Sequence, residues 1–90
     1  MYYVYIVRCN DGSLYTGFTR NLEKRIIEHN FSNRGAKSIK GKLPVKLVHK
    51  EILPSISEAL KREKEIKGWR KDKKESLIAF TQMSVAKMRA

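Results

Sequence analysis

The sequence predicts one small domain of the α/β class, in the α+β sense, with three strands and three helices. Two runs rich in aromatic and β-branched residues flank a turn signal, which is typical of a hairpin, and a third run alternates like a strand. The strands are predicted at 2–8, 13–18 and 45–52, and the helices at 22–31, 55–67 and 72–80. Because 90 residues leave no room for a second core, we expect one domain over residues 1–80 and a C-terminal tail at 81–90.

The loop of the hairpin decides where its tyrosines point. A two-residue turn would place Tyr5 and Tyr15 on opposite faces of the sheet. A three-residue loop at 10–12 would instead pair Tyr15 with Val7 and Gly17 with Tyr5. Only the second register puts both phenols on one face, and because Gly17 has no side chain it leaves space above the Tyr5 ring.

The first helix is predicted from its cap and from the residues that share one of its faces. Asn21 is a good N-cap for a helix over residues 22–31. At about 100° per residue, Arg25 and His29 are neighbours one turn apart. The apolar residues in the same sector are Leu22 and Ile26.

The segment 32–44 is predicted to be a loop, because it holds two Gly, one Pro and several basic residues without an apolar period. The strand that follows alternates apolar and polar residues. Alternation places Val45 and Leu47 on one face, with His49 as a further candidate for that face.

The second helix has clear start and stop signals. Ser55 and Glu58 have the spacing of a capping box, and Gly68 ends the helix after Lys67. Its apolar stripe consists of Ile56, Ala59, Leu60 and Ile66. Glu63 lies within that stripe, where a carboxylate is unexpected unless it has a use. The simpler interpretation is an ion pair with Lys67.

The third helix is predicted from a second capping-box spacing, Asp72 with Glu75. We expect it to run to about Phe80, with Leu77, Ile78 and Phe80 as its apolar contacts. The last ten residues carry no strong signal and are expected to fray.

The chain is strongly basic, with 20 Lys and Arg against 9 Asp and Glu and a net charge of +11. Residues 1–32 carry four basic and three acidic side chains, net +1, whereas residues 33–76 carry fourteen and six, net +8. A polyanion is the partner that such a balance attracts, although a solvated lysine-rich surface is the alternative. The candidates for backbone contacts are Lys37, Lys40, Lys42, Lys46, Arg70, Lys71, Lys73 and Lys74.

Cysteine and histidine usage excludes two classes of small protein. Cys9 is the only cysteine, so no intrachain disulfide forms, and with His29 and His49 alone a Cys/His zinc site is excluded. The opening MYYVYIV is apolar but too short for a signal peptide or a membrane span. We expect a cytoplasmic protein without a membrane partner.

Five side chains could together perform chemistry, namely Tyr5, Tyr15, Arg25, His29 and Glu63. Taken singly, each has an ordinary interpretation as a packing tyrosine, a solvated helix edge or an ion pair. Together they supply an oxygen ligand for Mg²⁺, a base, and cations for a phosphate, which is a set suited to phosphodiester cleavage.

Four short motifs occur in order: Y-V-Y at 3–5, Y-T-G at 15–17, R-I-I-E-H at 25–29 and S-E-A-L-K-R-E at 57–63. They resemble the GIY-YIG nuclease superfamily over about residues 1–80, and above all its small stand-alone bacterial members, which are similar to the N-terminal nuclease domain of the bacterial excinuclease. Tyr3-Val4 stands where the name motif has Gly-Ile, and Thr16 replaces its second Ile. Residues 64–80 hold no match for the asparagine of many members.

The resemblance implies a three-stranded antiparallel sheet flanked by helices, and one Mg²⁺ or Mn²⁺ held by Glu63. The matched site residues are Tyr5, Tyr15, Gly17, Arg25, His29 and Glu63. A free phenol has a pKa of about 10, so a tyrosine base at pH 7 would need that pKa lowered by about three units. We expect Tyr5 first, and Tyr15 second, to take the proton from water, with His29 orienting or relaying it and Arg25 stabilising the phosphate.

The predicted function is metal-dependent, structure-directed endonuclease cleavage of DNA, in DNA repair or recombination, with targeting by a protein partner as an option. The alternative is a basic nucleic-acid-binding module, for DNA or RNA, with weak or no cleavage. A third hypothesis is a docking protein for an acidic partner. The sequence leaves the oligomeric state open.

Overall fold

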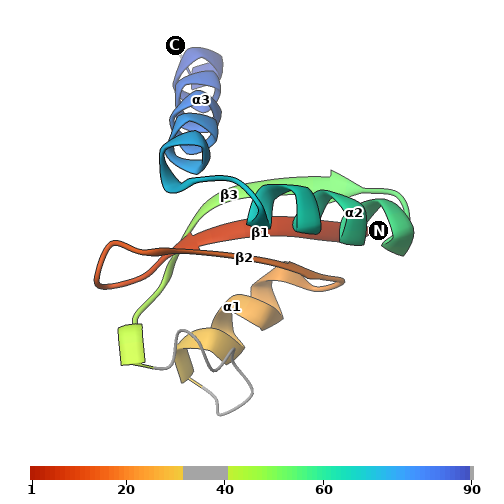
Figure 1. Cartoon of the computed structure of the whole chain (residues 1–90), viewed down its shortest axis with the longest axis horizontal. Helices are drawn as coiled ribbons and strands as arrows, with labels where there is room; N and C mark the ends of the chain where they lie inside the picture. The colour runs from red at the N-terminus through yellow and green to blue at the C-terminus, as the bar shows by residue number, and fades with distance from the viewer. Residues whose placement is uncertain (32–40, 90) are drawn as a thin grey trace.

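The computed structural model of the chain describes residues 1–31 and 41–89. Three strands form one antiparallel sheet in the order β2-β1-β3, namely β1 (Tyr2–Arg8), β2 (Leu14–Thr19) and β3 (Lys46–Leu53). The helices are α1 (Leu22–Phe31), α2 (Ile56–Lys67) and α3 (Lys71–Arg89). Figure 1 shows α1 and α2 on opposite sides of the sheet and α3 projecting from one end. The predicted α+β class is confirmed, and no described helix has the length and apolar character needed to cross a membrane.

Each face of the sheet has its own core, because side chains alternate along β1. On the side of α2 and α3 the buried residues are Val4, Ile6, Ala59, Ile66 and Ile78. On the side of α1 they are Tyr5, Val7, Cys9 and Val45. Tyr5 is fully buried in this second core, so a candidate catalytic side chain is held rigidly inside the fold.

The hairpin has the register that places both phenols on one face. Tyr5 pairs with Gly17 and Val7 with Tyr15, as a three-residue loop at 10–12 predicts. The amide of Cys9 donates to the carbonyl of Ser13 across 2.8 Å and closes that loop. The strand β2 itself ends at Thr19, one residue later than predicted.

The caps of α1 and α2 are confirmed. The Asn21 side chain accepts a hydrogen bond from the Lys24 amide at 3.1 Å, and Ser55 accepts one from the Glu58 amide at 3.2 Å. The predicted apolar stripe of α2 is only half right. Ala59 and Ile66 are fully buried, but Ile56 is 49% exposed and Leu60 is 44% exposed, because α2 contacts the sheet along a narrower face.

A bulge in β3 makes the prediction for His49 wrong. Ile6 pairs with His49, but Val7 pairs with Leu47, so Val48 is an extra residue on this strand. An extra residue reverses the alternation of the faces beyond it. His49 therefore lies on the Ile6 side, against α2 and α3, and not beside Leu47.

The third helix differs from its prediction at both ends. It begins at Lys71, and Glu75 does not cap it, because both of its carboxylate oxygens accept from the Arg8 guanidinium at 2.6 and 2.7 Å. The helix continues past residue 80 to Arg89. Ile78 is buried as predicted, whereas Phe80 is 69% exposed. The domain boundary at residue 80 stays a prediction.

A polar network under α3 joins three elements. His49 Nε2 lies 2.7 Å from Glu51 Oε2, and His49 Nδ1 lies 2.7 Å from Thr81 Oγ1 of α3. Arg62 of α2 donates to the same carboxylate at 2.8 and 3.1 Å. The hydrogen bond from His49, and then those from Arg62, lower the pKa of Glu51 to about 2.

This lowered pKa predicts a loss of stability in acid. A carboxyl group with a lowered folded-state pKa stabilises the fold above its unfolded value of 4.5, and that contribution is lost as the pH falls toward 2. At about 1.4 kcal/mol per pKa unit, Glu51→Gln should cost up to about 3 kcal/mol at pH 7 and much less near pH 2. Urea unfolding at both pH values measures this. Glu65→Gln, on an exposed carboxylate, should cost less than about 1 kcal/mol at pH 7, and an equal loss from both variants would contradict the account.

Candidate active site

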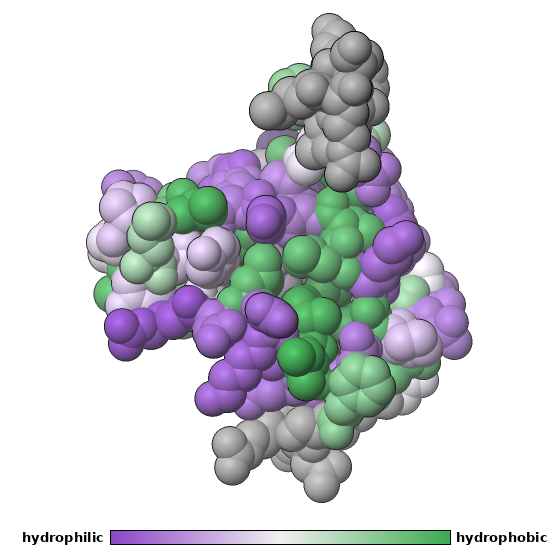
Figure 2. All heavy atoms as spheres, turned by 180° about the vertical axis from the view of Figure 1, so that it is seen from behind, coloured by the Kyte–Doolittle hydropathy of each residue, from purple (hydrophilic) through white to green (hydrophobic). Residues whose placement is uncertain are grey.

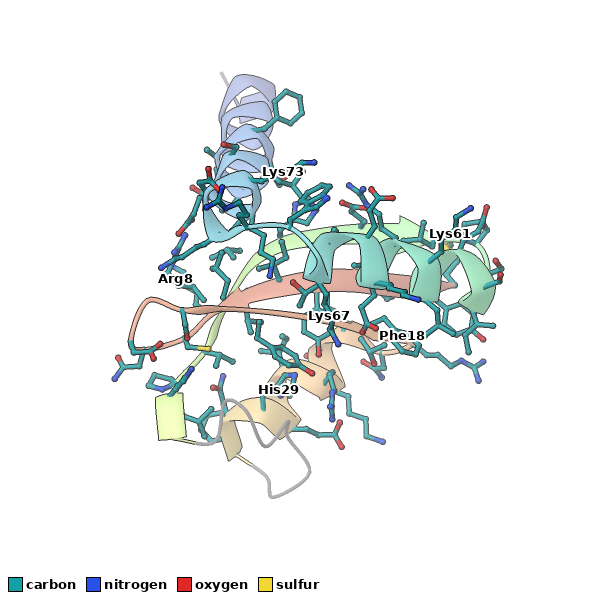
Figure 3. The ribbon with its side chains drawn as sticks, viewed as in Figure 1. Arg8, Phe18, His29, Lys61, Lys67 and Lys73 are labelled. Carbon is teal, nitrogen blue, oxygen red and sulfur yellow. The ribbon has the colours of Figure 1, made fainter. Side chains whose placement is uncertain are left out.

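Three of the five predicted side chains form an aromatic cluster, in which Tyr5 and His29 are buried and Tyr15 is half-buried. The Tyr5 hydroxyl lies 2.8 Å from His29 Nε2 and connects β1 to α1. The Tyr15 ring centroid lies 6.4 Å from that of Tyr5 and 5.4 Å from that of His29, with Tyr15 edge-on to the imidazole. Figure 3 shows His29 on the side of α1 that faces the sheet. The fold thus brings together side chains from β1, β2 and α1.

Gly17 lies beneath the Tyr5 ring. A Cβ atom at Gly17 would lie 2.5 Å from the Tyr5 hydroxyl oxygen and 2.7 Å from the ring carbon that carries it. The missing side chain leaves space at the Tyr5 ring, as predicted, and the ring itself occupies that space. This close approach directs the hydroxyl toward His29.

Gly17→Ala is expected to destabilise the fold by about 1–3 kcal/mol, the usual cost of overpacking a core. The new methyl group displaces the Tyr5 phenol and breaks its hydrogen bond to His29. Urea unfolding measures the loss, and the imidazole NMR signals report the broken bond. Gly41→Ala is the control, since a Cβ there has no neighbour within 4 Å. A Gly17→Ala protein as stable as the Gly41→Ala protein would contradict this packing.

Burial shifts the pKa values of Tyr5 and His29 in opposite directions. Burial raises the pKa of Tyr5 to about 12, although a hydrogen bond and the positive charge of Arg25 oppose the rise. This direction is opposite to the lowering that we expected for a tyrosine base. The pKa of His29 is lowered, first by burial and then by Arg25. At neutral pH, Tyr5 is therefore a protonated phenol and His29 a neutral imidazole, and the two side chains share the 2.8 Å hydrogen bond.

Arg25 and Glu63 bring charge to the cluster. The Arg25 guanidinium bonds to Tyr5 and also lies 3.6 Å from Glu28 Oε1 on the same helix. Glu63 belongs to α2, its side chain is 16% exposed, and its negative charge contributes to the raised pKa of Tyr5. The four other predicted side chains therefore all contact Tyr5 or influence its pKa.

Lys67 is a neighbour of this cluster that sequence analysis treated only as an ion-pair partner. Its Nζ lies 3.7 Å from Glu63 Oε1 and 5.9 Å from the centroid of the Tyr15 ring. Figure 3 shows Lys67 and His29 in the space between α2 and α1. Lys67 follows Glu63 by four residues, and this helical spacing is the sequence signal that places the two side chains next to each other.

Glu63 is the residue here that could hold a metal ion. The described residues contain no cluster of three or more His, Cys, Asp or Glu side chains with metal-binding geometry. Mg²⁺ is commonly bound by one or two carboxylates together with water and substrate phosphates, so one carboxylate is enough. The ion pair with Lys67 is long, at 3.7 Å, and the Lys67 side chain is 49% exposed, so a divalent cation could displace the ammonium group. The donor set fits a substrate-assisted Mg²⁺ or Mn²⁺ site.

The basic residues predicted to contact a nucleic-acid backbone lie at two places. Lys42 lies 3.7 Å from Asp11, and Lys46 is exposed on β3. Around the start of α3, the exposed cations are Arg70, Lys71 and Lys73, while Lys74 is partly buried. Lys73 also lies over the Trp69 ring, 4.3 Å from its centroid. Lys37 and Lys40 lie outside the described residues.

Comparisons with known proteins identify the family of this chain. The model of the GIY-YIG catalytic domain matches residues 1–76. A UPF0213 protein of Staphylococcus saprophyticus is 54% identical over 78 residues, covering 87% of this chain and 94% of that protein. One of Haloquadratum walsbyi is 51% identical over 76 residues, covering 84% of each. The solution NMR structure of a UPF0213 protein from Bacillus halodurans is 43% identical, with a TM-score of 0.57, and the match covers 89% of this chain and 85% of that one. The chain therefore belongs to the GIY-YIG family, a family of nucleases.

Proposed function

We propose that this protein hydrolyses phosphodiester bonds in DNA with the help of one divalent metal ion, and that it selects DNA structure rather than sequence, in repair or recombination. The observation that carries the proposal is the meeting of Tyr5, Tyr15 and His29 beside Arg25 and Glu63. A net charge of +11 supports a polyanionic substrate and sequence-independent phosphate contacts.

The pair of Tyr5 and His29 supplies the base. With a pKa of about 12, Tyr5 does not act as a phenolate at neutral pH. Instead, its oxygen takes the proton of the attacking water while its own proton passes along the 2.8 Å hydrogen bond to His29 Nε2. The proton ends on the imidazole, the phenol is regenerated, and the hydroxide oxygen forms the new bond to phosphorus. The leaving oxygen departs with the bonding electrons.

Arg25 and Glu63 would stabilise the negative charge of the phosphate. Arg25 already bonds to the Tyr5 hydroxyl, so its guanidinium would stabilise the negative charge that grows on the oxygens of a phosphate bound beside Tyr5. Glu63 would hold Mg²⁺ or Mn²⁺. When bound, such an ion stabilises negative charge on phosphate and leaving oxygens. Tyr15 keeps the imidazole in place through its edge-on contact.

A second candidate function is nucleic-acid binding with little or no cleavage. The observation that favours it is the ion pair of Glu63 with Lys67, which occupies the carboxylate that the metal needs. RNA is then as good a ligand as DNA. Replacing Lys67 by Gln frees that carboxylate, so the nuclease account predicts metal-dependent cleavage that persists or rises in this variant.

A cleavage assay on the native protein tests the proposal. Labelled single-stranded, duplex, flap and forked DNA, with a matching RNA set, is incubated in Mg²⁺, Mn²⁺ or EDTA. We expect products from DNA with a junction in either metal and none in EDTA. Salt-sensitive binding without products in any condition would refute the nuclease and establish the binding module.

A further inference from the structure

A second concave surface lies beside the cluster, between α1 and β3. We call it the α1–β3 groove, and its volume is about 610 Å³, which is in the range of ligand sites. Ile26 lines the groove, and Arg25, the residue before it on α1, points to the cluster about 100° away around the helix axis. Figure 2, which shows the molecule from behind, has an apolar surface with hydrophilic residues on both sides.

The lining combines an apolar wall, an aromatic ring and two cations. The apolar part is formed by Leu22, Ile26 and Leu47. Tyr3 contributes its ring, and Arg20 and Lys50 contribute positive charge against the single carboxylate of Glu23. None of the ion pairs among the described residues involves either cation. The Arg20 guanidinium lies over the Tyr2 ring, 5.6 Å from its centroid, and Tyr2 packs on the opposite face of the sheet. Lys50, which pairs with Tyr5, is therefore the cation available to an anion in the groove.

This lining fits a nucleotide. A base has two apolar faces that stack on aromatic rings, and the phosphate next to it pairs with Lys or Arg. Bases within a duplex are already stacked and paired, so they cannot enter a groove of this kind. The chemistry of the groove thus selects an unpaired nucleotide.

The groove also adjoins the proposed reaction centre. Tyr3 and Tyr5 point to the same face of β1, two residues or about 7 Å apart. Lys50 pairs directly with Tyr5 across the sheet, and Ile52, 55% exposed, pairs with Tyr3. A nucleotide held here would neighbour the one that is cut.

We propose that the α1–β3 groove binds an unpaired nucleotide of the substrate strand, with its base on Tyr3 and its phosphate at Lys50. The inference rests on the proposed function, since it takes a nucleic acid as the ligand. It deepens that function by naming the substrate class: DNA with a single-stranded segment next to the cleavage position.

Binding in EDTA tests this without any cleavage. Fluorescence anisotropy compares a short labelled oligothymidylate with a blunt hairpin duplex, for the native protein and its variants. Tyr3→Leu, which removes the ring but keeps an apolar side chain, should weaken oligothymidylate binding about fivefold or more and leave duplex binding unchanged. Tyr3→Phe should restore it. Lys50→Gln should weaken it too, whereas Lys61→Gln, an equal loss of charge on α2, should keep the ratio of the two affinities.

Each outcome bears on one proposal. Equal losses for both ligands in Tyr3→Leu, or no loss, would overturn the groove assignment even if the protein cleaves DNA. If Tyr3→Leu weakens only oligothymidylate binding and the native protein never cleaves DNA, the groove assignment stands and the proposed nuclease function is refuted. Thymidine monophosphate that binds as tightly as the oligothymidylate would show a free-nucleotide site and overturn the assignment to a strand.

Discussion

Tyr5→Phe is expected to lower the cleavage rate by about 10²–10⁴-fold, the usual contribution of a proton-transfer group. The variant keeps the ring that fills the space over Gly17, but it loses the hydroxyl that bonds to His29 Nε2 at 2.8 Å. Water then has no path for its proton to the imidazole. Single-turnover cleavage of a junction DNA in Mg²⁺ measures the effect.

Tyr2→Phe is the control for this experiment. Tyr2 lies on the same strand, but it packs in the core on the side of α2 and α3, so removal of its hydroxyl should leave the rate unchanged. Thermal unfolding of both variants separates chemistry from folding, because loss of a buried hydrogen bond costs about 1–3 kcal/mol in itself. Tyr5→Phe with full activity would show that Tyr5 carries no proton.

The pH dependence of cleavage has a predicted sign. The pKa of His29 lies below its ordinary value of 6.5, so the imidazole is neutral, and able to accept a proton, above that pH. The rate should be flat with respect to His29 above pH 6.5 and fall in acid. The Tyr5 phenol, with its pKa of about 12, should produce no rise near neutral pH. A rate that increases through about pH 7 to 9 would instead point to a phenolate base.

Local signals were enough to predict most of the fold. The register of the hairpin followed from loop length and from the need to put two phenols on one face, and Tyr5 opposite Gly17 confirms it. Asn21 and Ser55 cap their helices through contacts within three residues. Such features depend on neighbours in sequence, whereas the meeting of Tyr5 with His29 and Glu63 depends on the packing of α1 and α2 around the sheet.

The features that sequence analysis missed depend on contacts between distant segments. Glu75 has capping-box spacing, yet its carboxylate accepts hydrogen bonds from Arg8, which lies sixty-seven residues away in sequence. The bulge that turns His49 away from Leu47 is set by pairing with β1. The raised pKa of Tyr5 arises from burial, which no motif reveals. The α1–β3 groove likewise exists only once both elements are packed.

Glu63 is the residue whose replacement should have the largest effect. Because Glu63 is the carboxylate that we propose to hold the metal ion, its loss should prevent metal binding, and a thousandfold fall in rate corresponds to about 4 kcal/mol of transition-state stabilisation. Glu63→Gln keeps the size of the side chain, and its ion pair with exposed Lys67 contributes little to folding. The variant should therefore fold and still bind DNA.

The most direct test compares Glu63→Gln with Glu65→Gln, which removes the same charge from an exposed position on the same helix. Cleavage of junction DNA is followed over a range of Mg²⁺ and Mn²⁺ concentrations. The account predicts that Glu63→Gln loses at least about a thousandfold at every metal concentration, while Glu65→Gln matches the native protein. Cleavage by Glu63→Gln at the native rate, with the same metal dependence, would contradict the assignment of this cluster as a metal-dependent active site.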